Sequence, residues 1–201
     1  MNQIFMQTPV QGNYAIAWCI GVDCKFNGGF GVAAFTLAEL ESMVVVNMGD
    51  YKTARGETKL MTKDLGSCVG VALRDPHTGV GGLLHVMLPN HTMTGRQDFV
   101  AAKYADSGLD EMIDTLVLEG AQRKRLVAKI AGAAHMFHCD EIPESRDISS
   151  RNLNAVIEKL DALGIPLLAS DVGENFPRTV VFEPGSGSFR ILTPGKEEKM
   201  I

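Results

Sequence analysis

The sequence lacks any apolar run that could cross a membrane as a helix, since a span needs about 20 consecutive apolar residues. The apolar stretch 15–22 is short, follows no basic residue and is closed by Asp23, so we expect neither membrane insertion nor a signal peptide. The chain also lacks a basic cluster beyond Arg123-Lys124-Arg125, and its net charge is -5. Because such a chain repels phosphate, we expect no nucleic-acid partner.

Cysteine is scarce, and its spacing offers no complete metal site. The four cysteines are Cys19, Cys24, Cys68 and Cys139. Cys19 and Cys24 have a C-x4-C spacing without a second pair, which favours reduced thiols of a reducing cytosol over a zinc or disulfide role. His135 and His138 lie close to Cys139, but no strong partner set completes a site there. We therefore expect no metal and no cofactor.

Periodic patterning is weak at the start of the chain and strong from Met43 onward. Residues 1–42 are rich in Gly, Asn and Gln, and two interpretations remain open: a loosely ordered extension, or sequence read from an upstream start codon with the true beginning near Met43. Residues 43–193 are expected to form one folded domain, since 201 residues suit a single domain with spare length. Residues 194–201 form a charged tail that we expect to fray.

Strand and helix patterns alternate within this domain. Strands are predicted at 43–48, 68–74, 79–88, 126–130 and 165–169, with a hairpin of 179–182 and 188–192. Asp106 or Ser107 can cap the start of a first helix, which Gly120 stops. A second helix is expected to begin near Ser149 or Ser150 and to end at Gly164. Apolar side chains at helical spacing give each helix one stripe: Leu109, Met112, Ile113, Leu116 and Val117, then Leu153, Val156, Ile157, Leu160 and Leu163. Hairpins mixed with helices predict an α+β fold, a layered α/β sandwich of mixed, largely antiparallel sheets with two main helices.

A hairpin between two neighbouring predicted strands is expected to bring a thiol and an imidazole together. With a four-residue turn at 75–78, Arg74 pairs with Gly79. The same register places Cys68 directly opposite His85 on one face of the sheet, where facing Cβ atoms lie about 4.5–5.5 Å apart. A slip of one residue would put the two on opposite faces, so this inference depends on the position of the turn.

A Cys–His pair is the minimum for thiol catalysis. An imidazolium would lower the pKa of the Cys68 thiol, make it react faster with alkylating reagents than the other cysteines, and later donate a proton to the leaving group. Gly66 and Ser67 leave room for a substrate carbonyl, so the backbone N–H groups of Ser67 and Cys68 are candidate oxyanion donors. By themselves these residues leave an ordinary alternative open, in which the cysteine is a small apolar residue and the histidine has a structural role.

Two segments around this pair resemble a known family. Residues 62–69 read TKDLGSCV, and residues 81–89 read GGLLHVMLP. They resemble the patterns T-x-x-L-G-S-C-V and G-G-x-x-H-x-M-L-P of the CheD family, the chemoreceptor glutamine deamidases of bacterial and archaeal chemotaxis. Further matches are MGDY at 48–51, KYAD at 103–106, AKI at 128–130, LGIP at 163–166 and DVG at 171–173.

The resemblance implies a cysteine hydrolase that converts receptor glutamines to glutamate and releases ammonia. It assigns Cys68 as the nucleophile, His85 as the general acid and base, and Thr62 as the residue that orients His85. The implied partners are the cytoplasmic helices of methyl-accepting chemotaxis receptors and a CheC-type chemotaxis phosphatase. The implied location is the cytoplasm.

The chain also departs from the family pattern. AKIAGAAHM at 128–136 stands where the pattern reads A-K-I-F-G-G-A-N-M, and ISSRN at 148–152 stands where it reads I-G-E-R-N. These departures leave the contacts with substrate or partner open near Ala131, His135 and Ser149. Two other functions remain compatible: a regulatory module that docks a CheC-type phosphatase with little or no catalysis, and, from the residues alone, another thiol hydrolase such as a thioesterase or protease.

Overall fold

The structure is a computed structural model, which describes residues 35, 39, 42–93, 100–136 and 147–201. The two interpretations of residues 1–42 concern a segment that lies almost wholly outside the described residues. Four residues considered above as thiols or metal ligands also lie outside the described residues, namely Cys19, Cys24, His138 and Cys139.

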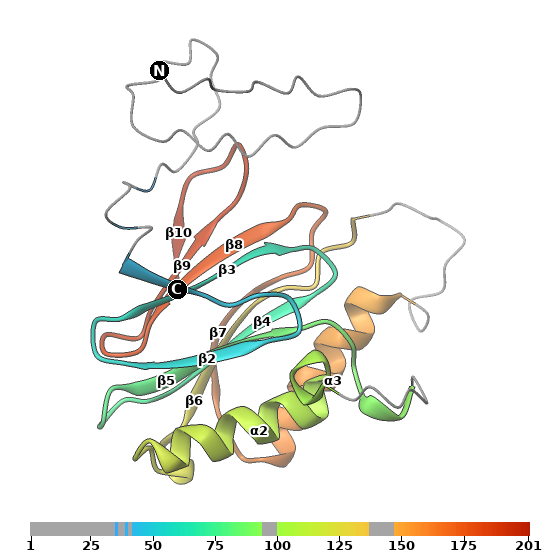
Figure 1. The fold of residues 1–201 in the computed structure, drawn as a ribbon. Coiled ribbons are helices and arrows are strands. Elements are labelled where there is room, and N and C mark those ends of the chain that lie inside the picture. The colour runs from blue at the N-terminus through green and yellow to red at the C-terminus, as the bar shows by residue number, and fades with distance from the viewer. Residues whose placement is uncertain (1–34, 36–38, 40–41, 94–99, 137–146) are drawn as a thin grey trace, which may run out of the picture.

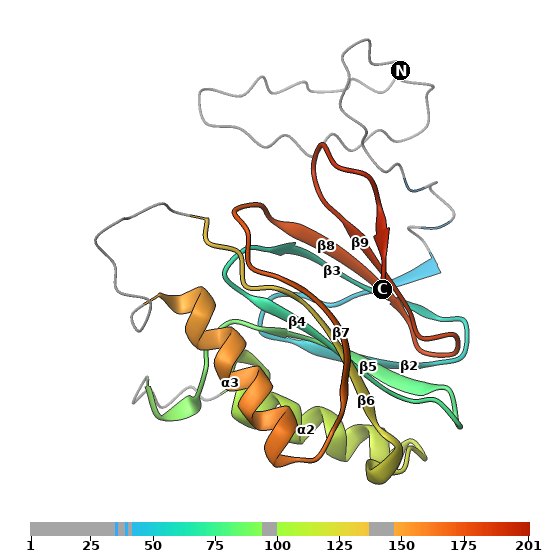
Figure 2. The same cartoon turned by 180° about the vertical axis from the view of Figure 1, so that it is seen from behind.

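Ten strands in the described residues form two five-stranded sheets (Figures 1 and 2). The first sheet contains β1 Met43–Val45, β3 Lys59–Leu65, β8 Arg178–Glu183, β9 Ser188–Leu192 and β10 Lys199–Met200, in that order. The second contains β2 Tyr51–Arg55, β5 Val80–Val86, β4 Val69–Asp75, β6 Val127–Gly132 and β7 Leu167–Val172, in that order. The helices are α2 Ala105–Leu118 and α3 Ile148–Ala162, with short 3-10 helices η1 His91–Met93, η2 Ala101–Lys103 and η3 Arg123–Arg125.

The sheets stack face to face, and both described helices cover the free face of the second sheet (Figure 1). This layering follows from the alternation of side chains along β4 and β5. Val71 and Leu84 pack with the helices, whereas Ala72 and Leu83 point to the first sheet. The core between the sheets further contains Leu60, Leu65, Val180, Phe182, Phe189 and Ile191. Since only the β1–β3 and β6–β7 pairs are parallel, the prediction of an α+β fold with mixed, largely antiparallel sheets is confirmed.

The turn between β4 and β5 occupies residues 76–79, one residue later than the predicted 75–78. Asp75 still pairs with Val80 as the last rung of the ladder. Its carboxylate is fully buried and accepts hydrogen bonds from the Arg125 side chain, which hold the pKa of Asp75 well below its ordinary value. A buried and paired aspartate belongs to the packed sheet, so the turn begins after it.

This displacement of the turn changes the strand register by two residues. Gly70, and not Cys68, lies opposite His85, so the predicted direct pairing of thiol and imidazole is wrong. A shift of two residues leaves each side chain on its predicted face, because the faces of a strand alternate with a period of two. Cys68 packs against the core between the sheets, and His85 contacts Thr62 of the first sheet. The prediction that Cys68 and His85 share one face is therefore confirmed.

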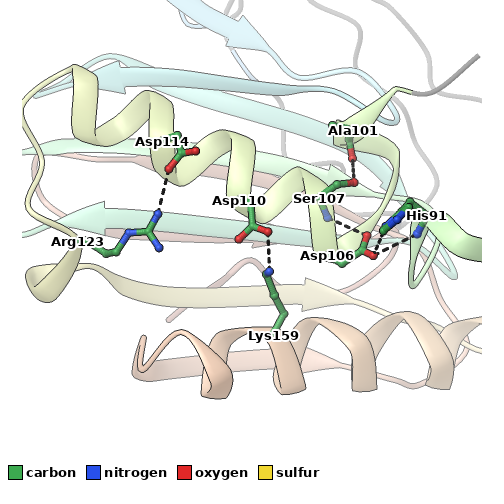
Figure 3. Close-up of polar contacts among 8 residues, drawn as sticks. All are labelled: His91, Ala101, Asp106, Ser107, Asp110, Asp114, Arg123 and Lys159. Atoms are coloured by element: carbon green, nitrogen blue, oxygen red, sulfur yellow. Dashed lines mark hydrogen bonds and ion pairs between the residues drawn. The ribbon is translucent and has the colours of Figure 1, made fainter.

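The predicted cap of the first helix is wrong, whereas the predicted start of the second helix near Ser149 or Ser150 is confirmed within two residues. α2 begins at Ala105 without a side-chain cap, and Asp106 lies inside its first turn. The Asp106 carboxylate instead pairs with the ring of His91, with 2.7 Å between Oδ2 and Nδ1 (Figure 3). The cap of α3 is Asp147, which accepts a hydrogen bond from the Ser150 N–H at 2.9 Å. Helical periodicity in the sequence reveals neither the Asp106–His91 pair nor the hydrogen bond from Ser150 to Asp147.

The predicted helix ends and stripes are largely confirmed. Gly120 and Gly164 follow the two helices with positive φ angles of 101° and 66°. Val117 and Ile157, predicted as buried, are each 42% exposed. The buried face of α3 instead includes two polar residues and consists of Ser149, Asn152, Val156 and Leu160.

The charged tail 194–201 extends the first sheet, so the expectation that it frays is wrong. Lys199 and Met200 form β10 against β9. Lys199 also pairs with the carboxylate of Asp171 on β7, and Ile201 packs against the core between the sheets. The charge of Lys199 thus stabilises the tail by a partner in the second sheet, which the sequence of the tail alone cannot reveal.

Candidate active site

Thr62 and His85 meet across the two sheets. Thr62 lies on β3 and His85 on β5, and Thr62 Oγ1 is 2.7 Å from His85 Nδ1. The Thr62 hydroxyl also donates to the carbonyl oxygen of Val46 at 2.9 Å. Because a hydroxyl has one hydrogen, Thr62 Oγ1 accepts the other bond, from the Nδ1–H of His85. The neutral ring therefore carries its proton on Nδ1, and Nε2 presents a lone pair.

A glycine and a strand irregularity allow this contact. Gly70 faces His85 on β4, and a Cβ there would lie 2.8 Å from Leu65 Cδ1 and 3.6 Å from Thr62 Cγ2. The ladder of β3 shifts register between Thr62 and Leu65, where Asp64 has a positive φ of 57°. Such irregularities bend a strand and redirect its side chains. Here the bend lies between Thr62 and the loop that carries Cys68.

His85 is buried and neutral. Only 1% of the residue is exposed, and burial lowers its pKa to about 4, an effect that the charge of Asp64 opposes. Its Nε2 forms no hydrogen bond with any part of the chain that the structure describes. A neutral imidazole whose Nδ1–H is bound and whose Nε2 lone pair is unused has the form of a general base.

Cys68 lies one residue before β4 and is half-buried. Burial raises the pKa of its thiol. The expectation that an imidazolium lowers this pKa is therefore wrong, because burial disfavours the charged forms of both Cys68 and His85. The resting site holds a neutral thiol and a neutral imidazole, so a nucleophilic thiol has to lose its proton at the moment of attack.

The main chain around Cys68 is held through its carbonyl oxygens. Three successive carbonyls accept hydrogen bonds: Gly66 from Ala134 N–H at 2.7 Å, Ser67 from Asn152 Nδ2 at 3.0 Å, and Cys68 from Ala133 N–H at 2.7 Å. The N–H groups of Ser67 and Cys68 form no hydrogen bond within the described ranges. Two unpaired N–H groups beside a thiol can bind an oxyanion, so both predicted donors remain candidates.

The end of β6 approaches Cys68 closely. Gly132 has a φ of 116°, and a Cβ there would lie 2.3 Å from the carbonyl oxygen of Cys68. The next residue, Ala133, has a φ of 52°, a left-handed conformation that costs a side-chain-bearing residue free energy. The CheD pattern has glycine at this second position. The chain thus keeps the close approach at Gly132 and carries a strained alanine beside it.

Sequence patterning missed Asn152. Its side chain is fully buried, and its Nδ2 donates to the carbonyl oxygens of Ser67 at 3.0 Å and Met87 at 2.9 Å. A signal was present, because Ser149, Asn152 and Val156 recur at i, i+3 and i+7 on one face of α3. A polar residue that shares a stripe with a core valine requires a buried partner.

The other candidate ligands form no metal site in the described residues. No group of three or more His, Cys, Asp or Glu side chains there could hold an ion. His135 pairs with Asp147, with 3.1 Å between Nδ1 and Oδ2. Among the helices of the described part, none is long and apolar enough to cross a membrane.

An open pocket of about 510 Å³ lies beside the main chain of His85. Its lining consists of Gly49, Asp50, Tyr51, Val100, Ala101, Ala102 and Glu111. The N–H of His85 donates to the carbonyl oxygen of Asp50 at 3.0 Å, which joins one wall of the pocket to β5. The opposite wall belongs to residues 100–102 and to Glu111 of α2.

Comparisons with known proteins agree with the resemblance. A family model described as CheD chemotactic sensory transduction matches residues 87–193, a span that begins after Thr62, Cys68 and His85. The probable chemoreceptor glutamine deamidase CheD of Lachnoclostridium phytofermentans is 42% identical over 159 residues, which cover 79% of this chain and 98% of that protein. The chemoreceptor glutamine deamidase CheD of Halalkalibacterium halodurans is 40% identical over 162 residues, which cover 81% of this chain and 100% of that protein.

Among solved structures, the hypothetical protein YfiH of Bacillus licheniformis resembles the chain weakly. The TM-score is 0.37 at 16% identity, over 61% of this chain and 49% of that one. This likeness is too small to establish a common fold.

Proposed function

This chain belongs to the CheD family, and from that premise we propose that it is a chemoreceptor glutamine deamidase whose nucleophile is Cys68. The observation that carries the proposal is the buried contact of Thr62 with His85. It leaves an imidazole lone pair on the side of the sheet where the Cys68 thiol also packs. A thiol with a histidine base is the minimum needed for covalent attack on an amide.

Acylation begins with proton transfer from Cys68 to His85. Nε2 of His85 accepts the thiol proton as Sγ bonds to the carboxamide carbon of the glutamine. The carbonyl oxygen takes up the negative charge, and the N–H groups of Ser67 and Cys68 stabilise it. The imidazolium then gives its Nε2 proton to the amide nitrogen, and the C–N bond breaks. Ammonia departs, and a thioester between Cys68 and the substrate side chain remains.

Deacylation repeats the same proton movements with water. Nε2 of His85 accepts a proton from water as the water oxygen bonds to the thioester carbon. The C–S bond breaks, the Cys68 sulfur recovers a proton from His85, and the product is a glutamate side chain. Thr62 holds the Nδ1–H throughout, so that Nε2 alone exchanges protons. Because threonine is uncharged, it orients the ring without stabilising the imidazolium as a carboxylate would.

The substrate in this proposal is a glutamine on the cytoplasmic helices of methyl-accepting chemotaxis receptors, and the reaction takes place in the cytoplasm. Relatives named chemoreceptor glutamine deamidases support the receptor as substrate. We place the receptor contacts flanking the glutamine at the pocket beside His85, because binding residues concentrate on loops held by a rigid scaffold. A CheC-type phosphatase is the proposed regulatory partner, and a change in deamidation rate on its addition tests that part.

Mass spectrometry of receptor fragments incubated with the protein tests the proposed function. Conversion of a carboxamide to a carboxylate raises a peptide's mass by about one unit for each glutamine. We expect this gain with the wild-type protein and with a Cys139→Ala control, and none with Cys68→Ala. Conversion by Cys68→Ala at near the wild-type rate overturns the assignment of the nucleophile.

A further inference from the structure

Asn152 on α3 reaches both segments that carry the proposed catalytic pair. Its Nδ2 donates to the carbonyl oxygens of Ser67 at 3.0 Å and Met87 at 2.9 Å. Ser67 immediately precedes Cys68 in the chain, and Met87 follows His85 by two residues. Since both partners are acceptors, the side-chain amide has only one favourable orientation, with its nitrogen toward them. The side chain is fully buried, so neither bond competes with solvent.

We propose that Asn152 is a positioning residue for deamidation, which acts by aiming the Cys68 N–H at the oxyanion. The inference rests on the proposed function, since it takes Cys68 as the nucleophile. In a trans peptide the C=O and the N–H point in opposite directions. The bond between Ser67 C=O and Asn152 therefore makes the N–H of Cys68 point away from α3.

The side of the second sheet that faces away from α3 is the side on which the proposed reaction takes place. The helix covers the face of the second sheet that is turned away from the first sheet (Figure 2). His85 lies on the opposite face, where it contacts Thr62. A Cys68 N–H that points away from α3 is thus directed toward the side on which the thiol and the imidazole lie. It forms no hydrogen bond of its own within the described ranges, so it is available to the substrate.

The second bond of Asn152 ties the two segments to each other. One nitrogen binds the loop before β4 and the chain just after β5, so displacement of one segment strains its link to the other. Leu160, two turns further along the same buried face of α3, offers a contrast. It is 2% exposed and packs in the core between the helices and the second sheet. A leucine side chain donates no hydrogen bond, so Leu160→Ala lowers stability through packing alone and provides the control.

The test compares Asn152→Ala with Leu160→Ala in the full chain. For each variant, kcat and KM are measured on a receptor fragment, and Tm is measured by thermal unfolding. We expect Asn152→Ala to lower kcat by about 10², the usual effect of losing one oxyanion donor. KM should stay within about twofold, because the oxyanion forms only in the transition state. Leu160→Ala should lower Tm at least as much and leave kcat within about twofold of wild type.

Asn152→Ser is the second variant, because it keeps a hydroxyl donor in less volume. It should recover part of the lost kcat, and it remains informative where Asn152→Ala does not fold. Asn152 variants whose kcat equals that of Leu160→Ala overturn the proposal. Cys68→Ala is assayed alongside them. If Cys68→Ala deamidates, the proposed function fails and the role of Asn152 with it; if it is inactive while the Asn152 variants keep full kcat, only the role of Asn152 fails.

Discussion

Thr62 Oγ1 and His85 Nδ1 lie 2.7 Å apart, although Thr62 belongs to the first sheet and His85 to the second. Both residues are buried, at 0% and 1% exposure. The orientation of the imidazole is therefore set by the packing of one sheet on the other and not by its own strand. Gly70 permits this packing, because a side chain there would collide with Leu65 of β3.

Thr62→Val removes the acceptor of the Nδ1–H while keeping the shape of the side chain. We expect kcat to fall about tenfold, the equivalent of one hydrogen bond, and Thr62→Ser to restore it. His85→Ala should cost about 10²–10⁴, because it removes both proton transfers. The kcat of each variant on a receptor fragment checks this order. A larger loss from Thr62→Val than from His85→Ala would show that the roles are assigned wrongly.

The stability of the fold should depend on pH through His85. Its pKa is about 4 in the folded chain and ordinarily 6.5, so between these values the unfolded chain binds a proton that the folded chain does not. Stability is therefore fully present above pH 6.5 and falls as the pH drops toward about 4. The total change from this group is about 3 kcal/mol. The free energy of unfolding is measured by urea titration at several pH values across this window. It should change less steeply with pH for His85→Gln than for wild type, and an equal pH dependence would contradict the burial argument.

Alkylation of Cys68 should report a thiol that is neutral at rest. Burial raises the pKa of this thiol above its ordinary value of 9.0. Since the thiolate is the reactive form, the rate of reaction with iodoacetamide should rise with pH around a midpoint higher than that of N-acetylcysteine. Residue-resolved mass spectrometry gives this profile. A midpoint below that of the free thiol would instead favour a resting thiolate–imidazolium pair.

Ala133→Gly should stabilise the protein. Ala133 has a φ of 52°, which glycine adopts without steric cost. Relief of this strain is worth about 1 kcal/mol or more, which outweighs the greater conformational entropy that glycine gives to the unfolded chain. We expect a higher urea midpoint with unchanged slope. A matched Ala128→Gly variant, within β6, should be destabilised, and destabilisation of Ala133→Gly as well would contradict the strained conformation.

Sequence periodicity predicted the elements whose burial follows a simple pattern. The α+β class, the hairpin of β8 and β9 and the glycines that follow both helices are confirmed. The prediction that Cys68 and His85 lie on the same face is also confirmed. Side chains alternate between the two faces of a strand, so a register shift of two residues leaves each on the same face.

The errors arose where polar side chains are buried against partners distant in the sequence. Asp75 resembles a turn residue, but its carboxylate binds Arg125, 50 positions away. Asn152 was not predicted as a site residue, because its partner, the Ser67 carbonyl, lies 85 positions away. The raised pKa of Cys68 has the same origin, since a local motif predicts a charged neighbour and only the packed fold determines desolvation.

The proposed mechanism requires His85 to be a neutral base whose proton is held on Nδ1 by Thr62. Nitrogen NMR of the isotope-labelled imidazole, followed through a pH titration, observes this directly. We predict a ring protonated on Nδ1 and free on Nε2, which titrates only near pH 4 and loses its tautomer preference in Thr62→Val. A ring protonated on Nε2 at neutral pH, or one that titrates near its ordinary value of 6.5, would contradict the account.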